Sequence, residues 1–265
     1  MLFNGYILFV YGDLEDLVIQ SFENDNSWYV ESDASSGLWD LVVPNPTYDD
    51  GVLAQTDADH SIDGEKCFVT GNDEVENNSG QDDVDGGTTT LYSNNYDLSA
   101  FDNVLLTYYR WYTNNLGNNP GTDYWVVQVS SDNGNNWIDL ENTNQSNPSW
   151  QQKRFVLNEY IELGDQVQFR FIASDLSYSG DVGSGGSLVE AALDDFMLEA
   201  VSYELQSGDV NFDNYVDVLD IIFIVNIILD NVDATQSQLS AADVTGDGNI
   251  DVTDIINLVN TILDN

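Results

Sequence analysis

The sequence predicts a mainly β protein in which an antiparallel jelly-roll β-sandwich is followed by a small α-helical pair of loop–helix repeats. Residues 17–201 consist of short aromatic and β-branched runs separated by Asn, Asp, Gly and Ser, and no part keeps a 3.6-residue period for long. Residues 208–265 instead contain two acidic turns that each run into an apolar helix. An apolar segment at 1–16 and a linker at 202–207 complete the predicted organisation.

The charge balance argues against two classes of partner. Five Lys and Arg residues face 47 Asp and Glu, which gives a formal net charge of −42. Such a surface repels nucleic acids and anionic lipids. No run approaches the ~20 apolar residues of a membrane span. We therefore expect neither nucleic-acid binding nor membrane insertion, and the hydrophobic content of 42% predicts a folded chain rather than a disordered acidic one.

Alternating apolar and turn-forming runs predict the strands of the sandwich. They fall at 17–22, 28–31, 67–70, 88–93, 104–112, 124–131, 154–157, 167–173 and 188–200. Residues 126–131, followed by an Asp-Asn-Gly turn and Trp137, have the form of a β-hairpin. The single cysteine, Cys67, lies in a predicted strand, so we expect a buried thiol and no internal disulfide.

The apolar segment at 1–16 needs a partner, because a free strand-prone tail promotes aggregation. One option is an extra strand on its own module. The other is donation to a neighbouring copy, which would generate filaments because a head-to-tail contact does not close on itself.

Oxygen-bearing residues recur at alternate positions of 209–220. Loop positions 1, 3, 5, 9 and 12 are Asp209, Asn211, Asp213, Asp217 and Asp220, and the backbone carbonyl of Tyr215 stands at position 7. A calcium ion is held by six or more oxygens that a turning loop supplies in this way. The spacing therefore predicts one Ca²⁺ ion in this loop.

A second loop repeats the pattern with Asp243, Thr245, Asp247, Asn249 through its carbonyl, Asp251 and Asp254. Thr245 is a weaker ligand than Asn or Asp, so we expect weaker binding here. Position 6 requires a permissive backbone and is Asn214 in the first loop and Gly248 in the second. Val216 and Ile250 at position 8 are expected to pack the loops together.

These repeats resemble the type I dockerin family over residues 208–265. Each loop runs into a predicted helix, 218–231 or 252–265, and each ends with Asp at position 12 where an ordinary EF-hand has Glu. The family implies two Ca²⁺ ions, a compact helical pair and non-covalent docking to a cohesin domain. Dockerin helices usually carry Lys or Arg for that contact, whereas no Lys or Arg follows Arg170 here.

The two predicted helices differ along one stripe. Leu219, Phe223 and Ile227 lie four residues apart in the first helix, and their equivalents are Thr253, Asn257 and Thr261. The repeats match instead at Ile221/Ile255, Ile222/Ile256, Val225/Val259 and Ile228/Ile262, which are expected to face a shared core. We therefore expect the unmatched stripe either to bind a partner or to cover the β module of the same chain.

Short pieces of the β region resemble the MAM domain and related jelly-roll modules of secreted bacterial proteins. Phe22-Glu23 before Trp28 resembles the family opening, Asp59-His60-Ser61 resembles its Asp-His-Thr turn, and residues 192–197 resemble its closing strand. The MAM disulfides are absent.

In that family a cation lies between the first and last strands. Carried over by position, Glu23, Asp59 and one of Asp194 or Asp195 would bind Ca²⁺; otherwise these carboxylates cap turns. Residues 82–85 form another dense acidic turn, which either binds a cation or, as is usual for a run of charges, is solvated.

We expect no catalytic activity. His60 is the only histidine, so a Ser–His–Asp or Cys–His pairing would have to use it. Zinc would find too few nitrogen and sulfur ligands, although 47 acids leave a two-carboxylate glycosidase as an alternative. Four aromatic residues form either a sugar platform or the sandwich core: Tyr108, Trp111, Trp125 and Trp150.

Together these observations predict a non-catalytic, extracellular or cell-surface, Ca²⁺-binding assembly protein. Copies would associate head to tail through residues 1–16 and the Leu219/Phe223/Ile227 stripe. The alternatives are an ancillary module of a secreted enzyme system that docks to a cohesin-like domain, and a carbohydrate-binding module.

Overall fold

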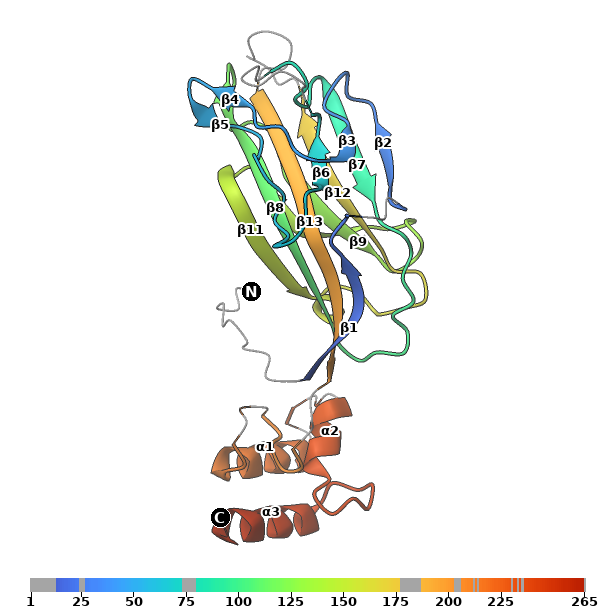
Figure 1. Cartoon of the computed structure of the whole chain (residues 1–265). Helices are drawn as coiled ribbons and strands as arrows, with labels where there is room; N and C mark the ends of the chain where they lie inside the picture. Colours follow the sequence, from blue (N-terminus) through green and yellow to red (C-terminus); the bar gives the residue numbers. More distant parts are fainter. Residues whose placement is uncertain are drawn as a thin grey trace. The chain divides into compact units, whose positions relative to one another are not determined.

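The computed structural model describes residues 13–23, 27–72, 80–176, 187–202, 206–211, 213, 215–229, 231–232, 234 and 236–264. One compact unit spans Leu14–Ser202, and a second contains Tyr203–Asn265. The first unit is built of strands and the second of helices and loops, so the predicted mainly β chain with C-terminal helices is confirmed (Figure 1). Residues 1–12 of the predicted N-terminal segment and 203–205 of the predicted linker lie outside the described residues.

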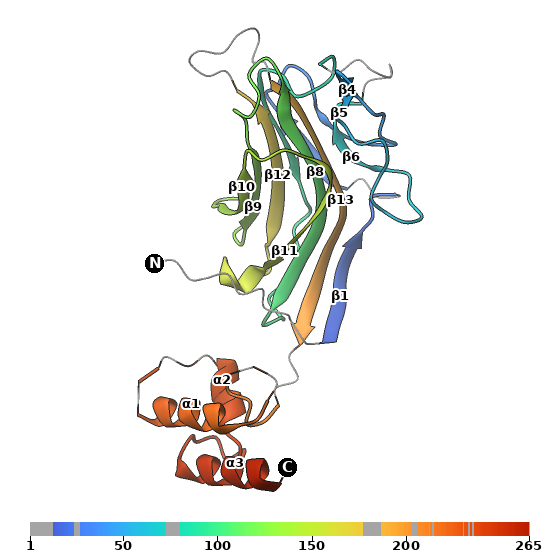
Figure 2. The same cartoon turned by 90° about the vertical axis from the view of Figure 1, so that its left-hand side faces the viewer.

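The larger sheet has six strands in the order β11-β8-β13-β6-β3, with β1 also paired to β13. Figure 2 shows the long strands β11, β8 and β13 with β1 beside β13. Its strands are β1 (Asp13–Gln20), β3 (Trp39–Val42), β6 (Cys67–Thr70), β8 (Val104–Gly117), β11 (Asn147–Val156) and β13 (Ser187–Ser202). The long antiparallel pair β8–β13 is interrupted by bulges, one of which lies between Asp194 and Met197. This bulge later proves to lie at a cluster of acidic side chains.

The smaller sheet is antiparallel and has the order β10-β9-β12-β7-β2. Its strands are β2 (Tyr29–Ser32), β7 (Gly87–Tyr92), β9 (Trp125–Ser130), β10 (Ile138–Thr143) and β12 (Gln168–Asp175). The predicted hairpin is confirmed as β9–β10. A short hairpin of β4 (Tyr48–Asp49) and β5 (Val52–Leu53), and the 3₁₀ turn η1 (Leu157–Glu159), lie outside both sheets.

The two sheets enclose an aromatic core. Trp28 stacks with Phe68 and Phe171 and meets Phe196 edge to face. Tyr108 and Trp125 are fully buried in the same cluster. These two side chains therefore fill the core and are not available as a sugar platform.

A second apolar layer covers the outer side of the larger sheet. Trp111 packs there with Cys67 and Ala192, and Trp150 borders this cluster. The segment 43–66 crosses the layer and is fixed by a hydrogen bond from Trp111 Nε1 to the Ala54 carbonyl, 2.7 Å. The expectation of a buried Cys67 thiol is confirmed. This arrangement carries the segment that contains Asp59 and His60 towards β13.

The helical unit contains α1 (Val218–Ile228), α2 (Gln236–Ala242) and α3 (Val252–Asp264). Its core is formed by Val210, Ile224, Ala241, Ala242 and Leu258, with Val216 and Ile250 of the two loops packed against it. Among the described residues, none of the helices has the length and apolar character that a membrane crossing demands.

Several elements differ from the prediction. Strands β3, β4 and β5 and helix α2 were not predicted, β10 was predicted only as the second strand of a hairpin, and β11 begins at Asn147 rather than near 154. β10 and β11 are edge strands with largely polar, exposed side chains, so the apolar alternation that indicates a strand is missing. α2 has only seven residues and therefore gives almost no helical period.

The helical unit gives a test of close packing. Gly208 has φ +96°, and a Cβ there would lie 2.5 Å from Leu258 Cδ1, whereas a Cβ on Gly246, at φ +72°, would meet nothing within 4 Å. We expect Gly208→Ala to destabilise the Ca²⁺-loaded unit by about 3 kcal/mol, because strain and overpacking add, and Gly246→Ala by about 1 kcal/mol. Denaturant unfolding followed by circular dichroism at 222 nm measures both, and equal losses would contradict the packing argument.

Candidate calcium sites and helix faces

The first predicted loop is held by the two carboxylates that close it. Asp220 is fully buried, and its Oδ1 accepts the backbone N–H groups of Val210 at 2.8 Å and Asn211 at 3.1 Å. Its Oδ2 accepts the N–H of Asp217 at 2.9 Å, and Asp217 in return accepts the N–H of Leu219 at 2.7 Å. Positions 9 and 12 of the loop are thus also the capping box that starts α1.

The second loop repeats this geometry. Asp254 is fully buried and accepts the N–H groups of Thr245 at 3.0 Å and Asp251 at 2.8 Å. Asp251 accepts the N–H of Thr253, as Asp217 does in the first loop. Gly248 has the positive φ expected at position 6, +83°, while Asn214 lies outside the described residues. Both loops therefore present the same frame of oxygens at the start of a helix.

The electrostatics of Asp254 favour an ionised loop. Burial raises the pKa of this carboxyl, but the backbone N–H groups of Asp251 and Thr245 bind its charged form and bring the pKa below its ordinary value. Among the described residues, no three His, Cys, Asp or Glu side chains converge on one point as metal ligands. Those residue types leave out the other predicted ligands, which are the amide or hydroxyl at position 3 and the backbone carbonyl at position 7. Occupancy of the two loops by Ca²⁺ therefore stays a prediction.

Replacing the weaker ligand tests the second loop. We expect Thr245→Asn to tighten Ca²⁺ binding there by about tenfold, because an amide oxygen replaces a hydroxyl at position 3, as in the first loop. Titration calorimetry of the full chain measures the affinity, with Thr253→Asn on the following helix as control. Equal affinity of Thr245→Asn and the unmodified chain would remove Thr245 from the ligand set.

The four carboxylates predicted for the β module come together from three segments. Glu23 follows β1, Asp59 belongs to the crossing segment, and Asp194 and Asp195 stand at the bulge of β13. Glu23 Oε1 accepts the backbone N–H groups of residues 65 and 66, both at 3.1 Å. A Cβ on Gly64 would collide with Glu23 Oε1 and Asp59 Oδ2, so both carboxylates close over this glycine.

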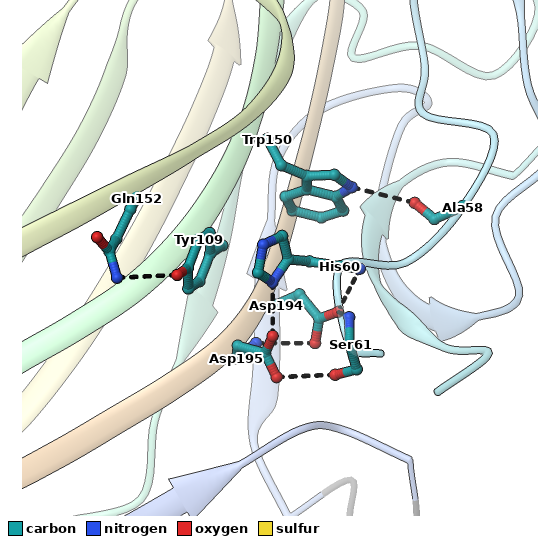
Figure 3. A network of polar contacts seen from close by, with 8 residues as sticks. All are labelled: Ala58, His60, Ser61, Tyr109, Trp150, Gln152, Asp194 and Asp195. Atoms are coloured by element: carbon teal, nitrogen blue, oxygen red, sulfur yellow. Dashed lines mark hydrogen bonds and ion pairs between the residues drawn. The ribbon is translucent and has the colours of Figure 1, made fainter. Parts of the chain in front are cut away.

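Asp194 and Asp195 bind the turn that carries His60 (Figure 3). Asp194 Oδ2 accepts the N–H groups of His60 at 2.8 Å and Ser61 at 3.2 Å. Asp195 contacts His60 Nδ1 at 2.6 Å and accepts the Ser61 hydroxyl at 2.7 Å. Ser61 thus donates to Asp195 rather than to His60, which is not the arrangement of an activated serine.

Backbone strain marks the same place. Phe22 and Asp195 are non-glycine residues with φ of +56° and +46°. Such conformations persist only where the surrounding structure enforces them, and they concentrate at functional sites. Phe22 directly precedes Glu23, and Asp195 itself belongs to the acidic cluster.

Uncompensated negative charge makes this cluster suited to a cation. Burial raises the pKa of Asp194 to about 7. Burial, followed by the charges of Glu23 and Asp195, also raises the pKa of Asp59, whose Oδ2 is buried without a hydrogen-bond partner in the described structure. An oxygen-only donor set with excess negative charge fits Ca²⁺. Its occupancy, and the choice between Asp194 and Asp195, stay predictions.

Sequence reasoning missed the aromatic surroundings of His60. The imidazole stacks on Tyr109 with ring centroids 3.5 Å apart, and it meets Trp150 edge to face (Figure 3). Trp150 Nε1 donates to the Ala58 carbonyl at 3.2 Å, and Tyr109 accepts a hydrogen bond from Gln152. These residues are distant in sequence, so only the fold brings them together.

The raised pKa of Asp194 gives a pH prediction for the Ca²⁺-free chain. Its folded pKa, about 7, lies above the ordinary value of 3.8, so the folded state binds the proton more tightly than the unfolded state. This contribution to stability is complete below about 3.8 and is lost as pH rises through about 7. In EDTA, Asp194→Asn should therefore flatten the pH dependence of unfolding between pH 5 and 8, whereas exposed Asp165→Asn should not. Tryptophan fluorescence measures it; parallel curves for Asp194→Asn and the unmodified chain would contradict the assignment.

Two of the three residues in the predicted partner stripe on α1 lie against the core of their own unit. Leu219 is 52% exposed, but Phe223 and Ile227 are half-buried and pack against the core of the helical unit. The matched positions expected to face inward include Ile222 and Ile256, which are exposed. The repeats match on outward as well as inward positions, so matching did not identify the buried face.

The structure instead exposes one apolar stripe on each helix, and we call these the helix stripes. They consist of Val218, Ile222, Val225 and Leu229 from α1, and Val252, Ile256, Val259 and Leu263 from α3. Each set has the spacing i, i+4, i+7, i+11, which places it along a single face. All but the half-buried Val259 are exposed.

Comparisons with known proteins agree with the C-terminal resemblance. Residues 207–263 match the dockerin type I domain family. No curated protein matches the chain.

Three solved structures are similar to the chain at low identity. The K1 cleaved adhesin domain of Lys-gingipain from Porphyromonas gingivalis is 15% identical with a TM-score of 0.43, covering 70% of this chain and 98% of that one. The CBM22-1 xylan-binding domain from Paenibacillus barcinonensis is 13% identical with a TM-score of 0.37, covering 72% and 97%. A C-terminal family 22 carbohydrate binding module from Clostridium thermocellum is 8% identical with a TM-score of 0.37, covering 70% and 94%.

Proposed function

We propose that this chain is a non-catalytic, extracellular Ca²⁺-binding module that docks to a cohesin-like domain through its helical unit. The observation that carries the proposal is the pair of exposed helix stripes at the end of two calcium-type loops. The dockerin type I match over residues 207–263 supports the same role. The β-sandwich is then the ancillary part that docking brings to an assembly.

Burial of the helix stripes supplies a reason to dock. Val218, Ile222 and Leu229 of α1 are each more than half exposed, and Val252, Ile256 and Leu263 of α3 are so too. Covering a large aliphatic side chain gains roughly 1.5–3 kcal/mol relative to leaving it in water. Contiguous apolar surface of this kind marks an interaction site.

The charge of the helical unit sets the chemistry of the partner. No Lys or Arg follows Arg170, so this surface offers a partner no basic side chain. A matching cohesin-like face must therefore be apolar at its centre and must not present a dense acidic rim, because like charges would oppose binding. This distinguishes the proposed contact from one that depends on Lys or Arg in the helices.

Calcium links the loops to the docking face. Asp217 and Asp251 cap the starts of α1 and α3, and they are also predicted ligands. Removing the ion leaves several loop carboxylates to repel one another directly beside both helices. Docking should therefore require Ca²⁺.

A second copy of the chain is the alternative partner. The helix stripes could bury one another across two copies, and the apolar sequence at residues 1–16 is suited to strand donation. This is the self-association predicted from sequence, with the docking residues corrected. Deleting residues 1–12 and measuring particle size by light scattering in Ca²⁺ tests the strand-donation part separately.

A pair of substitutions that place a charge on each helix stripe tests the docking face. We expect Ile222→Asp with Ile256→Asp to weaken binding to a cohesin at least about 100-fold, because each buries a carboxylate in an apolar contact. The control is Thr253→Asp with Asn257→Asp, which adds the same charge at exposed positions of α3 outside the stripe. Titration of a panel of cohesins, with Ca²⁺ and with EDTA, measures the affinities.

The outcomes separate the two partners. Binding that needs Ca²⁺ and is lost only in the stripe variant supports docking to a cohesin. Self-association is supported if the unmodified chain forms a dimer or larger particle and binds no cohesin, and if the stripe variant stays monomeric. A chain that stays monomeric in Ca²⁺ and binds no cohesin rules out both roles for the helix stripes.

A further inference from the structure

A second group of acidic side chains gathers at one end of the smaller sheet. Asp83 and Asp85 lie four and two residues before β7, Asp123 lies two residues before β9, and Asp175 is the last residue of β12. β12 lies between β7 and β9, and Asp175 pairs with Gly87 while Ala173 pairs with Trp125. The topology therefore brings all four carboxylates to the same end of three adjacent strands.

Three of these carboxylates are buried. Asp123 and Asp175 are fully buried and Asp83 is 2% exposed. Neither carboxylate oxygen of Asp175 has a hydrogen-bond partner in the described structure, nor has Oδ1 of Asp83. The backbone N–H of Gly86 is near enough to favour the charged form of Asp175 and so to lower its pKa, but it does not form a hydrogen bond with either oxygen. A buried charged oxygen without donors is costly, so something must compensate it.

The side chain of Asp123 is held in place beside the carboxylate of Asp175. Its Oδ1 accepts the N–H of Leu176 at 2.8 Å, and its Oδ2 accepts the Thr122 hydroxyl at 3.1 Å. The backbone around Asp83 is anchored as well, since its carbonyl accepts the Ser36 hydroxyl at 2.8 Å and the N–H of Val84 donates to the Val189 carbonyl. The Asp123 side chain and the backbone at Asp83 are therefore both fixed by hydrogen bonds to neighbouring segments.

The local charge is negative. Burial raises the pKa of both Asp83 and Asp175 to about 7, and the charges that add most to this rise are those of neighbouring carboxylates. Two of the five basic side chains, Arg110 and Lys153, instead bind Glu141. The sequence had suggested that the acidic turn at 82–85 is solvated, but Asp83 is buried.

We propose that Asp83, Asp85, Asp123 and Asp175 bind a divalent cation, Ca²⁺, that joins the ends of β7, β9 and β12. The donors are all oxygens, the choice of a hard cation. In the described structure no three of these side chains converge on one point. Binding of the ion would therefore draw them closer together. Backbone carbonyls and water would complete the six or more ligands of Ca²⁺. The site is separate from the one at Asp194. Val84, next to Asp83, donates its N–H to the Val189 carbonyl on β13. Asp194 is five residues further along β13, about 15 Å from Val189.

The competing explanation is protonation of Asp175 in place of an ion. Asp123 lies close enough to accept a hydrogen bond from a protonated Asp175. Such a pair would need no ion, and replacing one member with Asn would not change Ca²⁺ binding. The two explanations therefore predict different results for the same isosteric variants.

The test uses the full chain with Asp175→Asn, Asp123→Asn and the exposed control Asp102→Asn. Native mass spectrometry counts the bound Ca²⁺ ions. Fluorescence-detected unfolding then reports the sandwich alone, because all six Trp residues lie between positions 28 and 150. We expect each site variant to bind one ion fewer, and the Ca²⁺-induced rise in the unfolding midpoint to shrink by about 5 °C. The Asp102→Asn control should match the unmodified chain.

Folding of the variants is checked by the remaining ions. A site variant that still binds every other Ca²⁺ ion and keeps its native tryptophan emission is folded, so its missing ion supports the proposal. An unchanged ion count in Asp175→Asn and Asp123→Asn overturns it. A higher unfolding midpoint of both variants in EDTA, with an unchanged response to Ca²⁺, also overturns the proposal. That result is expected if Asp175 is protonated and no ion is bound.

Discussion

Compensation of buried negative charge is the constraint on which this structure depends. With 47 acidic and five basic residues, ion pairs with Lys or Arg cannot neutralise the interior carboxylates. The loops of the helical unit solve this with backbone N–H groups, three of which bind Asp220. Asp59, Asp83 and Asp175 each have a buried carboxylate oxygen without a hydrogen-bond partner in the described structure, and burial raises the pKa of each. Protonation or a bound hard cation can compensate such a charge.

The same carboxylates connect charge to shape. In the helical unit, the residues that close each loop also cap a helix, so the direction of the helix and the geometry of the loop are set together. In the sandwich, Asp194 and Asp195 tie the last strand to the crossing segment through His60 and Ser61. Asp175 lies where β12 meets its neighbours in the smaller sheet. Cations at these places would hold together segments that no disulfide joins.

Local pattern predicted the elements whose signal is local. The hairpin β9–β10 follows from its turn, β6 from an apolar run, and both long helices from the apolar stretches that follow the two acidic loops. Edge strands such as β11 and the short α2 were missed because exposed polar residues carry no apolar period. The sequence could not show which side of α1 faces the core, because that helix is apolar on nearly every side.

The sequence alone determined the mainly β class, the two calcium-type loops and the resemblance of residues 207–263 to dockerins, because each depends on spacing within a short segment. It also placed Glu23, Asp59 and one of Asp194 or Asp195 in one candidate site, but only through resemblance to a family. Tertiary structure alone decided that Ile222 and Ile256 face outward and that Asp123 and Asp175, 52 positions apart, share one end of a sheet. Strand order and helix rotation are set by packing across the whole chain, and no local pattern contains that information.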